Sequence, residues 1–345
     1  FDARYFELYL FAYFSRSGFE VDRTRNAPDF IVSRNGVKVA VEATTVNPSQ
    51  DAVKKSKPMA EMSPEELEQY QNEELPVKFG SPLFSKLNQR YWELEHCEGL
   101  PLVLAIEAFH IDEALDFSGA SLSQYLYGKR HHGIWSNDKS LEIHSETINT
   151  HRVDEKIIPS HFFGQPDTEN ISAIVFTNSG TQAKFSRQGY QHGYNTDEIE
   201  ITRFGFSYNP EPDAMDPTYF SYNLSEPPFT EPWGQGLVVN HNPNARIPLV
   251  KGYFVEALET YVENDEVKSD LPSWHPITAT TLIVHVGAGG KSAYNAPRIA
   301  IGGIPQRIFQ SLCGFALSNE HPIVDEDGWF MDETESFLGV VIHDK

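Results

Sequence analysis

The first half of the chain alternates between helical and strand patterns of apolar residues. Residues 4–17 (RYFELYLFAYFSRS) carry apolar side chains around much of a helical cylinder and precede Gly18, which predicts a largely buried helix ending there. After a short strand in FEVDRT, the β-branched runs 29–34 and 37–44 flank Asn35-Gly36, a dipeptide that favours two-residue turns. These two runs predict a β-hairpin.

The hairpin is followed by a polar stretch. Residues 47–79 are expected to form an inserted, solvated segment. It contains a short helix at 64–73, which Ser63 is expected to cap because a serine hydroxyl accepts a hydrogen bond from the first turn of a helix.

A second amphipathic helix and an apolar strand come next. Residues 81–95 have Pro82 near the start and an apolar stripe made of Leu83, Leu87, Tyr91 and Leu94. The near-continuous apolar run 101–109 is typical of a strand that is covered on both faces. The predicted order of elements is therefore α β β β α β.

The second half of the chain has weaker patterns. A buried strand is expected at 171–177, an irregular stretch at 204–248, a helix near 252–263, and strands at 279–286 and 298–302. We therefore expect an α/β (α+β) protein with a mixed central sheet.

The expected core spans residues 1–115, with the insertion at 47–79. Residues 116–345 elaborate this core or form a second domain, and strand 171–177 is a candidate to join the core sheet.

Composition narrows the class of protein. A formal charge of −22 disfavours a protein that coats nucleic acid non-specifically, although a bound cation and a local basic strip can still meet a phosphate. Two cysteines, Cys97 and Cys313, exclude a disulfide framework and a zinc site built on thiolates. The chain has no apolar run long enough for a membrane span and no signal-peptide pattern at its start, so a cytoplasmic location is expected.

Asp29 and Glu42 are the candidate site residues. They fall on the two paired strands of the hairpin, and each is flanked by apolar residues, where an unpaired charge is costly. A shared Mg²⁺ or Mn²⁺ would offset this cost, because hard cations take carboxylate oxygens. The structural alternatives are a capping role for Asp29 at the strand start and an ion pair of Glu42 with Arg23 or Arg25.

These residues resemble the PD-(D/E)XK nuclease superfamily, which has the restriction-endonuclease-like fold. Pro28-Asp29 matches the first half of its motif and Glu42-Ala43-Thr44 the second, and the likeness covers about residues 4–109. The resemblance implies an αβββαβ core in which Asp29, Glu42 and the main-chain carbonyl of Ala43 bind the metal, with Glu7 assisting.

Thr44 departs from the superfamily pattern, which has a lysine at this position. The resemblance allows the lysine to come from elsewhere, and the candidates are Lys86 on the following helix, which we favour, and Lys38 on the face of Glu42. Gln89, next to Lys86 on that helix, is a further candidate site residue.

Other motifs are weaker. The sequence TLIVHVGAGGKS (281–292) lacks the spacing of a phosphate-binding loop, and the histidines lack the spacing of a zinc peptidase. Ser179 lacks the glycine that precedes the serine of a nucleophile elbow. In the polar run that follows it, Lys184 and Arg187 are expected to be able to contact phosphate.

The leading hypothesis is a metal-dependent endonuclease-like phosphodiesterase that acts on DNA, or less favourably on RNA, in bacterial restriction or anti-phage defence. The alternative is an inactive module of the same fold that binds nucleic acid or a protein partner, which the missing lysine supports. A third hypothesis is a small-molecule enzyme. Partners would be nucleic acid, a second copy of the chain or a protein of a defence system, with no membrane.

Overall fold

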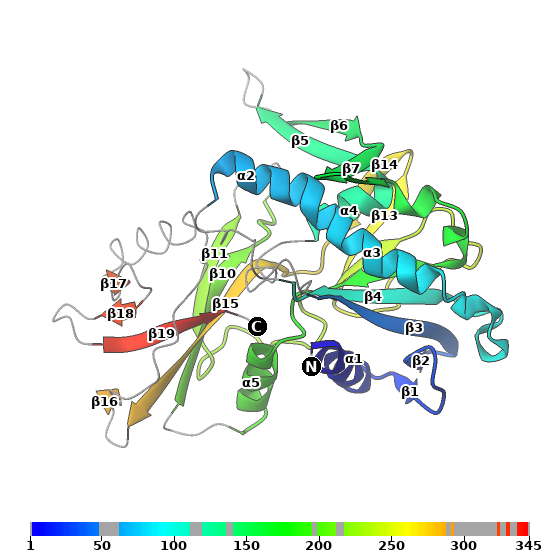
Figure 1. Ribbon diagram of the computed structural model, residues 1–345. Helices are drawn as coiled ribbons and strands as arrows, with labels where there is room; N and C mark the ends of the chain where they lie inside the picture. The colour runs from blue at the N-terminus through cyan, green and yellow to red at the C-terminus, as the bar shows by residue number, and fades with distance from the viewer. Residues whose placement is uncertain are drawn as a thin grey trace.

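The chain forms a mixed α/β structure with a large mixed sheet and few helices (Figure 1). The computed structural model describes residues 2–47, 62–110, 119–135, 141–194, 199–211 and 217–287, together with the short segments 291–292, 323–324, 329–331 and 337–343. The predicted strand 298–302 and Cys313 lie outside the described residues.

The first 110 residues contain one strand-rich run between two helical regions. The elements are α1 (Asp2–Arg16), β1 (Glu20–Asp22), β2 (Phe30–Arg34), β3 (Val37–Val46), α2 (Pro64–Gln69), the π-helical turn η2 (Tyr70–Glu74), α3 (Leu75–Leu87), the 3-10 turns η3 (Tyr91–Glu93) and η4 (Glu95–Cys97), and β4 (Leu102–Ala108).

The later part of the chain is richer in strands. Among its described residues, the helical elements are α4 (Ala120–Tyr127), α5 (Gln182–Gln191) and the 3-10 turns η6 (Phe162–Gly164) and η7 (Thr168–Asn170). Its strands are β5 (Lys129–Trp135), β6 (Leu141–Thr147), β7 (Thr150–Val153), β8 (Lys156–Pro159), β9 (Ala173–Phe176), β10 (Ile199–Ser207), β11 (Thr218–Asn223), β12 (Val238–His241), β13 (Leu258–Glu263), β14 (Glu266–Asp270), β15 (Pro276–Gly287), β16 (Lys291–Ser292), β17 (Ile323–Val324), β18 (Trp329–Met331) and β19 (Phe337–His343).

The large sheet contains strands from both halves of the chain. Within the described residues its order is β1-β2-β3-β4-β9-β12-β13-β14. β3 pairs in parallel with β4, and β4 in parallel with β9, whereas β1, β2 and β3 are antiparallel neighbours. The predicted strand at 171–177 therefore joins the sheet beside β4.

Helices cover both faces of this sheet. Figure 1 shows α1 on one side of β3 and β4, and α3 on the other. Alternate residues of β3 separate accordingly: Val39, Val41 and Ala43 pack in the core layer of α1, and Ala40 and Val46 in the layer of α3. The side chain of Glu42 therefore points toward the α3 layer.

The N-terminal helix is buried on one face only. Phe6, Tyr9 and Tyr13 are fully buried, but Leu8 and Phe11 are exposed, which corrects the prediction of apolar packing around much of the cylinder. The Arg23 guanidinium lies 5.7 Å from the centre of the Phe11 ring and partly covers it.

The hairpin is confirmed. Phe30 pairs with Val41 and Arg34 with Val37, so the turn consists of Asn35 and Gly36, with φ values of 52° and 78°. Both residues tolerate positive φ, which is why this dipeptide sets the register that places Asp29 beside Glu42.

The helix predicted at 81–95 is wrong in its bounds. Helical structure starts at the Ser63 capping box and continues through the π-helical turn into α3, which ends at Leu87 and has Pro82 in its interior. The end of the supposed solvated segment, including Leu75 and Phe79, is buried in the core. Arg90 adopts a φ of 52°, so the chain leaves the helical path before Tyr91.

The predicted helix near 252–263 is also wrong. Residues 258–263 form β13, which pairs with β14 across a turn at Asn264 and Asp265, with φ values of 53° and 65°. This pair of turn residues between two alternating runs is the local signal for a hairpin. The stretch 204–248, predicted to be irregular, contributes the end of β10 together with β11 and β12.

A second, antiparallel sheet lies beside the first. Its order within the described residues is β11-β10-β15-β19-β18-β17, and β16 pairs with β15. The predicted strand 279–286 lies within β15. Figure 1 shows α5 near the end of α1, on the side where this second sheet lies.

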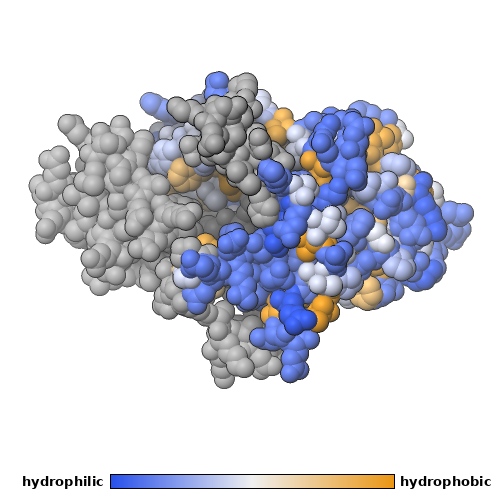
Figure 2. Space-filling view, turned by 90° about the horizontal axis from the view of Figure 1, so that it is seen from above, coloured by the Kyte–Doolittle hydropathy of each residue, from blue (hydrophilic) through white to orange (hydrophobic). Residues whose placement is uncertain are grey.

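Among the described residues, no helix is both long and apolar enough to span a bilayer. In the face drawn in Figure 2, the coloured surface is mostly hydrophilic and its apolar residues form small separate patches.

Candidate active site

Asp29 and Glu42 are held together by reciprocal hydrogen bonds with the main chain. The Asp29 N–H donates to Glu42 Oε2 at 3.1 Å, and the Ala43 N–H donates to Asp29 Oδ2 at 2.9 Å. The ladder between β2 and β3 ends at the Phe30–Val41 pair. The next N–H of β3 on the β2 side is that of Ala43, and it binds the aspartate. The two predicted acids therefore meet at the end of this ladder.

Lys86 reaches the pair from α3, as the sequence analysis favoured. Its Nζ donates to Glu42 Oε1, and the Tyr91 hydroxyl donates to the same oxygen at 2.7 Å. Glu42 is buried, with 5% of its surface exposed, whereas the Lys86 side chain keeps 27% of its surface exposed. The ammonium group therefore lies at the boundary between the core and the solvent.

The neighbouring carboxylates alter the titration of the site. Burial and the negative charge of Glu42 raise the pKa of Asp29 to about 6, although the Ala43 N–H and Lys86 act in the opposite direction. Burial and the hydrogen bond to Glu42 raise the pKa of the Tyr91 hydroxyl well above its ordinary value, so this group stays a donor. Below about pH 6 Asp29 therefore keeps its proton, and a bound cation would favour its ionised form.

The oxygens of this site fit a hard divalent cation. The N–H and C=O of a strand residue point to the same side, so the Ala43 carbonyl is directed to the side on which its N–H meets Asp29. Two carboxylates and this carbonyl are the ligand types that Mg²⁺ and Mn²⁺ prefer. Among the residues that the structure describes, no cluster of three or more His, Cys, Asp or Glu side chains is placed to hold a metal, so the third protein ligand would be this main-chain oxygen.

Other predicted site residues lie further from the carboxylates. Lys38 is exposed beside the hairpin turn, and Gln89 is exposed beyond the end of α3. Thr44 is half-buried and, being two residues after Glu42, lies on the same face of β3. These positions leave Lys86 as the predicted lysine that contacts Glu42.

Glu7 affects the site through its charge. Its carboxylate pairs with Arg4 at 2.7 Å and with Arg23 at 3.6 Å, and it adds to the rise in the pKa of Asp29. Because Arg23 pairs with Glu7, it is not the partner of Glu42 that the structural alternative suggested.

Lys184 and Arg187 occupy a different environment from the one predicted. Both are fully buried, and both form ion pairs with Glu231, at 2.6 and 2.8 Å. As placed here, these cations face a protein carboxylate in the interior, and a surface contact with a nucleic-acid phosphate would require them to move.

An open cavity of about 320 Å³ adjoins the carboxyl end of β3 and the middle of α3. Its lining includes Lys78 and Lys156, and the Lys156 ammonium donates to Ser81 Oγ at 3.0 Å. Lys78 and Lys86 are eight residues apart on α3, which separates them by about 80° around the helix axis. Lys78, Lys86 and Lys156 thus place positive charge near the carboxylates and this cavity, which Glu74 also lines.

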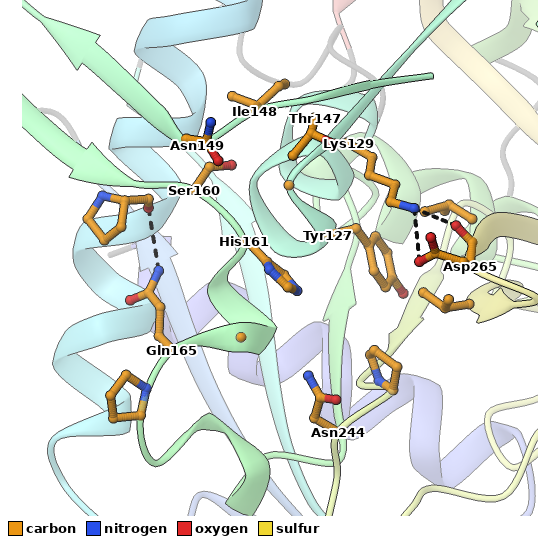
Figure 3. A pocket seen from close by; sticks show the side chains of 17 residues that line it. Tyr127, Lys129, Thr147, Ile148, Asn149, Ser160, His161, Gln165, Asn244 and Asp265 are labelled. Carbon is orange, nitrogen blue, oxygen red and sulfur yellow. Dashed lines mark hydrogen bonds and ion pairs between the residues drawn. The ribbon is translucent and has the colours of Figure 1, made fainter. Parts of the chain in front are cut away.

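A larger cavity, of about 980 Å³, is separate from this site. Figure 3 shows Asn149, Gln165 and Asn244 around it, with the His161 ring between them. His161 has a φ of 58°, and a Cβ added at Gly128 or Gly164 would lie 2.7 Å from it, so these glycines make room for the side chain. None of the residues that line this cavity belongs to the Asp29–Glu42 site.

Sequence reasoning missed two polar features. Tyr91 was assigned to the apolar stripe of a helix, but the turn at Arg90 instead directs its hydroxyl to Glu42. Glu107 in β4 is fully buried and accepts a hydrogen bond from the Gly180 N–H at 2.8 Å. Its position in the apolar run 101–109 was the available signal, because a carboxyl group in such a strand needs a partner.

The chain was also compared with known proteins. No protein-family model, no curated protein and no solved structure matches it. Its function is therefore argued from the site.

Proposed function

We propose that the protein is a metal-dependent phosphodiesterase of the endonuclease type, acting on DNA in preference to RNA. The observation that carries this proposal is the convergence of Asp29, Glu42 and Lys86, two acids and one cation, from the residue before β2, from β3 and from α3. The order α1, β1, β2, β3, α3, β4 supports a restriction-endonuclease-like core around them. A role in bacterial restriction or anti-phage defence is a further prediction of the resemblance.

In this proposal Asp29, Glu42 and the Ala43 carbonyl hold Mg²⁺ or Mn²⁺. When bound, the cation supplies a lowered pKa for a bound water and a positive charge for the phosphate oxygens. The hydrogen bonds from the Ala43 and Asp29 N–H groups fix the two carboxylates before a ligand arrives. Such preorganisation reduces the reorganisation needed when charge develops on the substrate.

Lys86 has two functions in this scheme. In the free protein its ammonium group neutralises Glu42. With a cation on the carboxylates, the half-exposed ammonium is free to turn to a phosphate oxygen, where it would stabilise the extra negative charge of the transition state. Tyr91 keeps Glu42 in position by its hydrogen bond throughout.

The neighbouring cavity is the proposed path for the nucleic-acid backbone. Lys78 and Lys156 supply positive charge there, and phosphate contacts position a nucleic acid without reading its sequence. The formal charge of −22 is compatible with this path, because only the positive charge next to the backbone phosphates has to attract them.

The test is cleavage of plasmid DNA and of single-stranded RNA with Mg²⁺ or Mn²⁺. We expect Asp29→Asn, Glu42→Gln and Lys86→Met to abolish cleavage, and Lys38→Met to leave it unchanged. Lys38→Met is the matched control, because it removes an exposed lysine four residues from Glu42 on the same strand. Cleavage that persists in both acid variants would refute the proposed site.

The second candidate function is a binding module without catalytic activity. It is favoured by the hydrogen bonds of Glu42, whose Oε1 is bound by Lys86 and Tyr91 and whose Oε2 is bound by the Asp29 N–H. The hydroxyl of Thr44 also cannot replace the positive charge of a lysine. Metal-independent binding of DNA without any cleavage would favour this second function.

A further inference from the structure

A buried cluster of charges lies where α5 meets the second sheet. Lys184 and Arg187 from α5 and Arg203 from β10 surround Glu231, at 2.6, 2.8 and 3.4 Å. All four side chains have at most 2% of their surface exposed. Three cations therefore share one carboxylate in the interior.

This cluster has more positive charge than its carboxylate can neutralise. Burial would raise the pKa of Glu231, but the charges of Arg187, Arg203 and Lys184 hold it well below its ordinary value, so the carboxylate is ionised. Burial and the charges of the two arginines together lower the pKa of Lys184 to about 8, against the opposing effect of Glu231. A buried charge without a counterion is costly, which makes an additional anion favourable here.

A cavity of about 60 Å³ lies next to the cluster, at the junction of the two sheets. It is lined by Arg203, by the start of β15 and by the segments that follow β9 and precede β12. A single water needs roughly 10–15 Å³ of such volume, so the cavity has room for several waters or for one small ion.

Polar atoms of several residues that line this cavity are buried without a hydrogen-bond partner. They include Arg203 Nε, His275 Nδ1 and Thr278 Oγ1. Arg203 is 1% and His275 4% exposed, so bulk water cannot supply the missing hydrogen bonds of these side chains. Buried polar groups of native proteins are nearly always paired, which indicates a ligand or water at this position.

We propose that this cavity binds a small oxyanion, such as a phosphate or carboxylate group, between Arg203, His275 and Thr278. The Arg203 Nε–H is a permanent donor, and the Thr278 hydroxyl rotates to donate. The anion supplies the negative charge that the cluster of three cations and one carboxylate lacks. A neutral ligand of the same size would satisfy the hydrogen bonds but not the charge.

The neighbouring groups fit this ligand. Burial lowers the pKa of His275 to about 4, so at neutral pH its ring is uncharged and can donate from Nδ1 without adding to the positive charge. Gly236 has a φ of 89°, and a Cβ there would lie 2.4 Å from Ser179 Oγ, so this glycine leaves room for the Ser179 hydroxyl at the cavity wall. The cavity shares no lining residue with the Asp29–Glu42 site, so the proposed anion site does not depend on the proposed phosphodiesterase.

The experiment uses the full chain and inorganic phosphate, with acetate as the second oxyanion. Binding is measured by isothermal titration calorimetry and by the midpoint of thermal unfolding, at constant ionic strength maintained with chloride. We expect saturable binding of phosphate, acetate or both, and a midpoint that rises with that ligand well beyond the effect of chloride.

Thr278→Val and Arg203→Gln identify the site. Thr278→Val is nearly isosteric and removes an unpaired hydroxyl, so the ligand-free midpoint should stay equal or rise, while the Kd of the anion rises roughly tenfold or more, as expected for losing one hydrogen bond to a charged group. Arg203→Gln should abolish binding. Arg246→Gln, at an ion pair on the surface, is the matched control and should leave the Kd unchanged.

Two results would overturn the proposal. One is the absence of saturable binding of both phosphate and acetate to the wild-type chain. The other is a Kd that is the same in the wild type and in Thr278→Val, because Thr278→Val preserves the shape of the side chain and keeps the test valid even if Arg203→Gln fails to fold.

Discussion

Replacing Asp29 by Asn tests whether the negative charges of Asp29 and Glu42 repel each other and whether a bound cation reduces this repulsion. The substitution keeps an oxygen to accept the hydrogen bond from the Ala43 N–H and removes the charge. The folded protein raises the pKa of this carboxyl from 3.8 to about 6, so the folded state holds a proton that the unfolded chain has already lost in this range. Wild-type stability therefore falls as the pH rises from about 4 to about 6, and the loss persists at higher pH.

The size of this effect follows from the same two values. The difference between 3.8 and about 6 corresponds to roughly 3 kcal/mol at about 1.36 kcal/mol per pH unit. Asp29 is only half-buried, and solvent screening reduces this figure to about 1–2 kcal/mol. Without metal, Asp29→Asn should thus equal the wild type near pH 4 and exceed it by about 1–2 kcal/mol above pH 7.

The assay is urea unfolding at a series of pH values, with and without Mn²⁺. A cation at 100 times its Kd stabilises the wild type by about 2.7 kcal/mol, and the Asn variant should lose most of this gain. Asp154→Asn, at an exposed turn position between β7 and β8, is the matched control. A difference between Asp29→Asn and the wild type that does not change with pH, or an equal gain from Mn²⁺ in both proteins, would refute the reasoning.

Three other predictions concern stability around the buried acids. Lys86→Met should lower the free energy of unfolding by about 1–2 kcal/mol, which is less than for a fully buried pair because Lys86 is partly exposed. Lys38→Met should leave this free energy unchanged, and urea unfolding of the two variants tests the difference. Tyr91→Phe should cost about 1–2 kcal/mol through its lost hydrogen bond to Glu42, and an unchanged unfolding midpoint would contradict this. Burial raises the pKa of Glu107 well above its ordinary value, so wild-type stability is retained at low pH and declines as the pH rises. The free energy of unfolding of Glu107→Gln should therefore match that of the wild type at pH 5 and exceed it at pH 8. The opposite order would be evidence against a protonated Glu107.

Local signals in the sequence were sufficient where one interaction decides the structure. Asn35-Gly36 determines the hairpin turn, and the turn sets the register that brings Asp29 to Glu42. Asn264-Asp265 carries the same kind of signal, and this turn outweighs the pattern that predicts a helix near 252–263, where β13 lies.

Other features depend on contacts that no local pattern contains. Pro82 was placed at a helix start because proline is favoured there, but the packed core carries the helix through it from Leu75 to Leu87. Lys184 and Arg187 follow a turn and appear available to solvent, yet Glu231, more than 40 residues later, makes their burial possible. Composition cannot reveal such a partner.

Under the proposed function, Lys86 supplies the positive charge that the superfamily pattern has at the position of Thr44. Glu42 and Thr44 lie on the face of β3 that α3 covers, as the packing of Ala40 and Val46 shows. A lysine at position 44 would direct its ammonium into the same space that Lys86 enters from α3. Two lysines would repel each other there. In the proposed phosphodiesterase the cation therefore acts from α3, and the short side chain of Thr44 leaves room for Lys86.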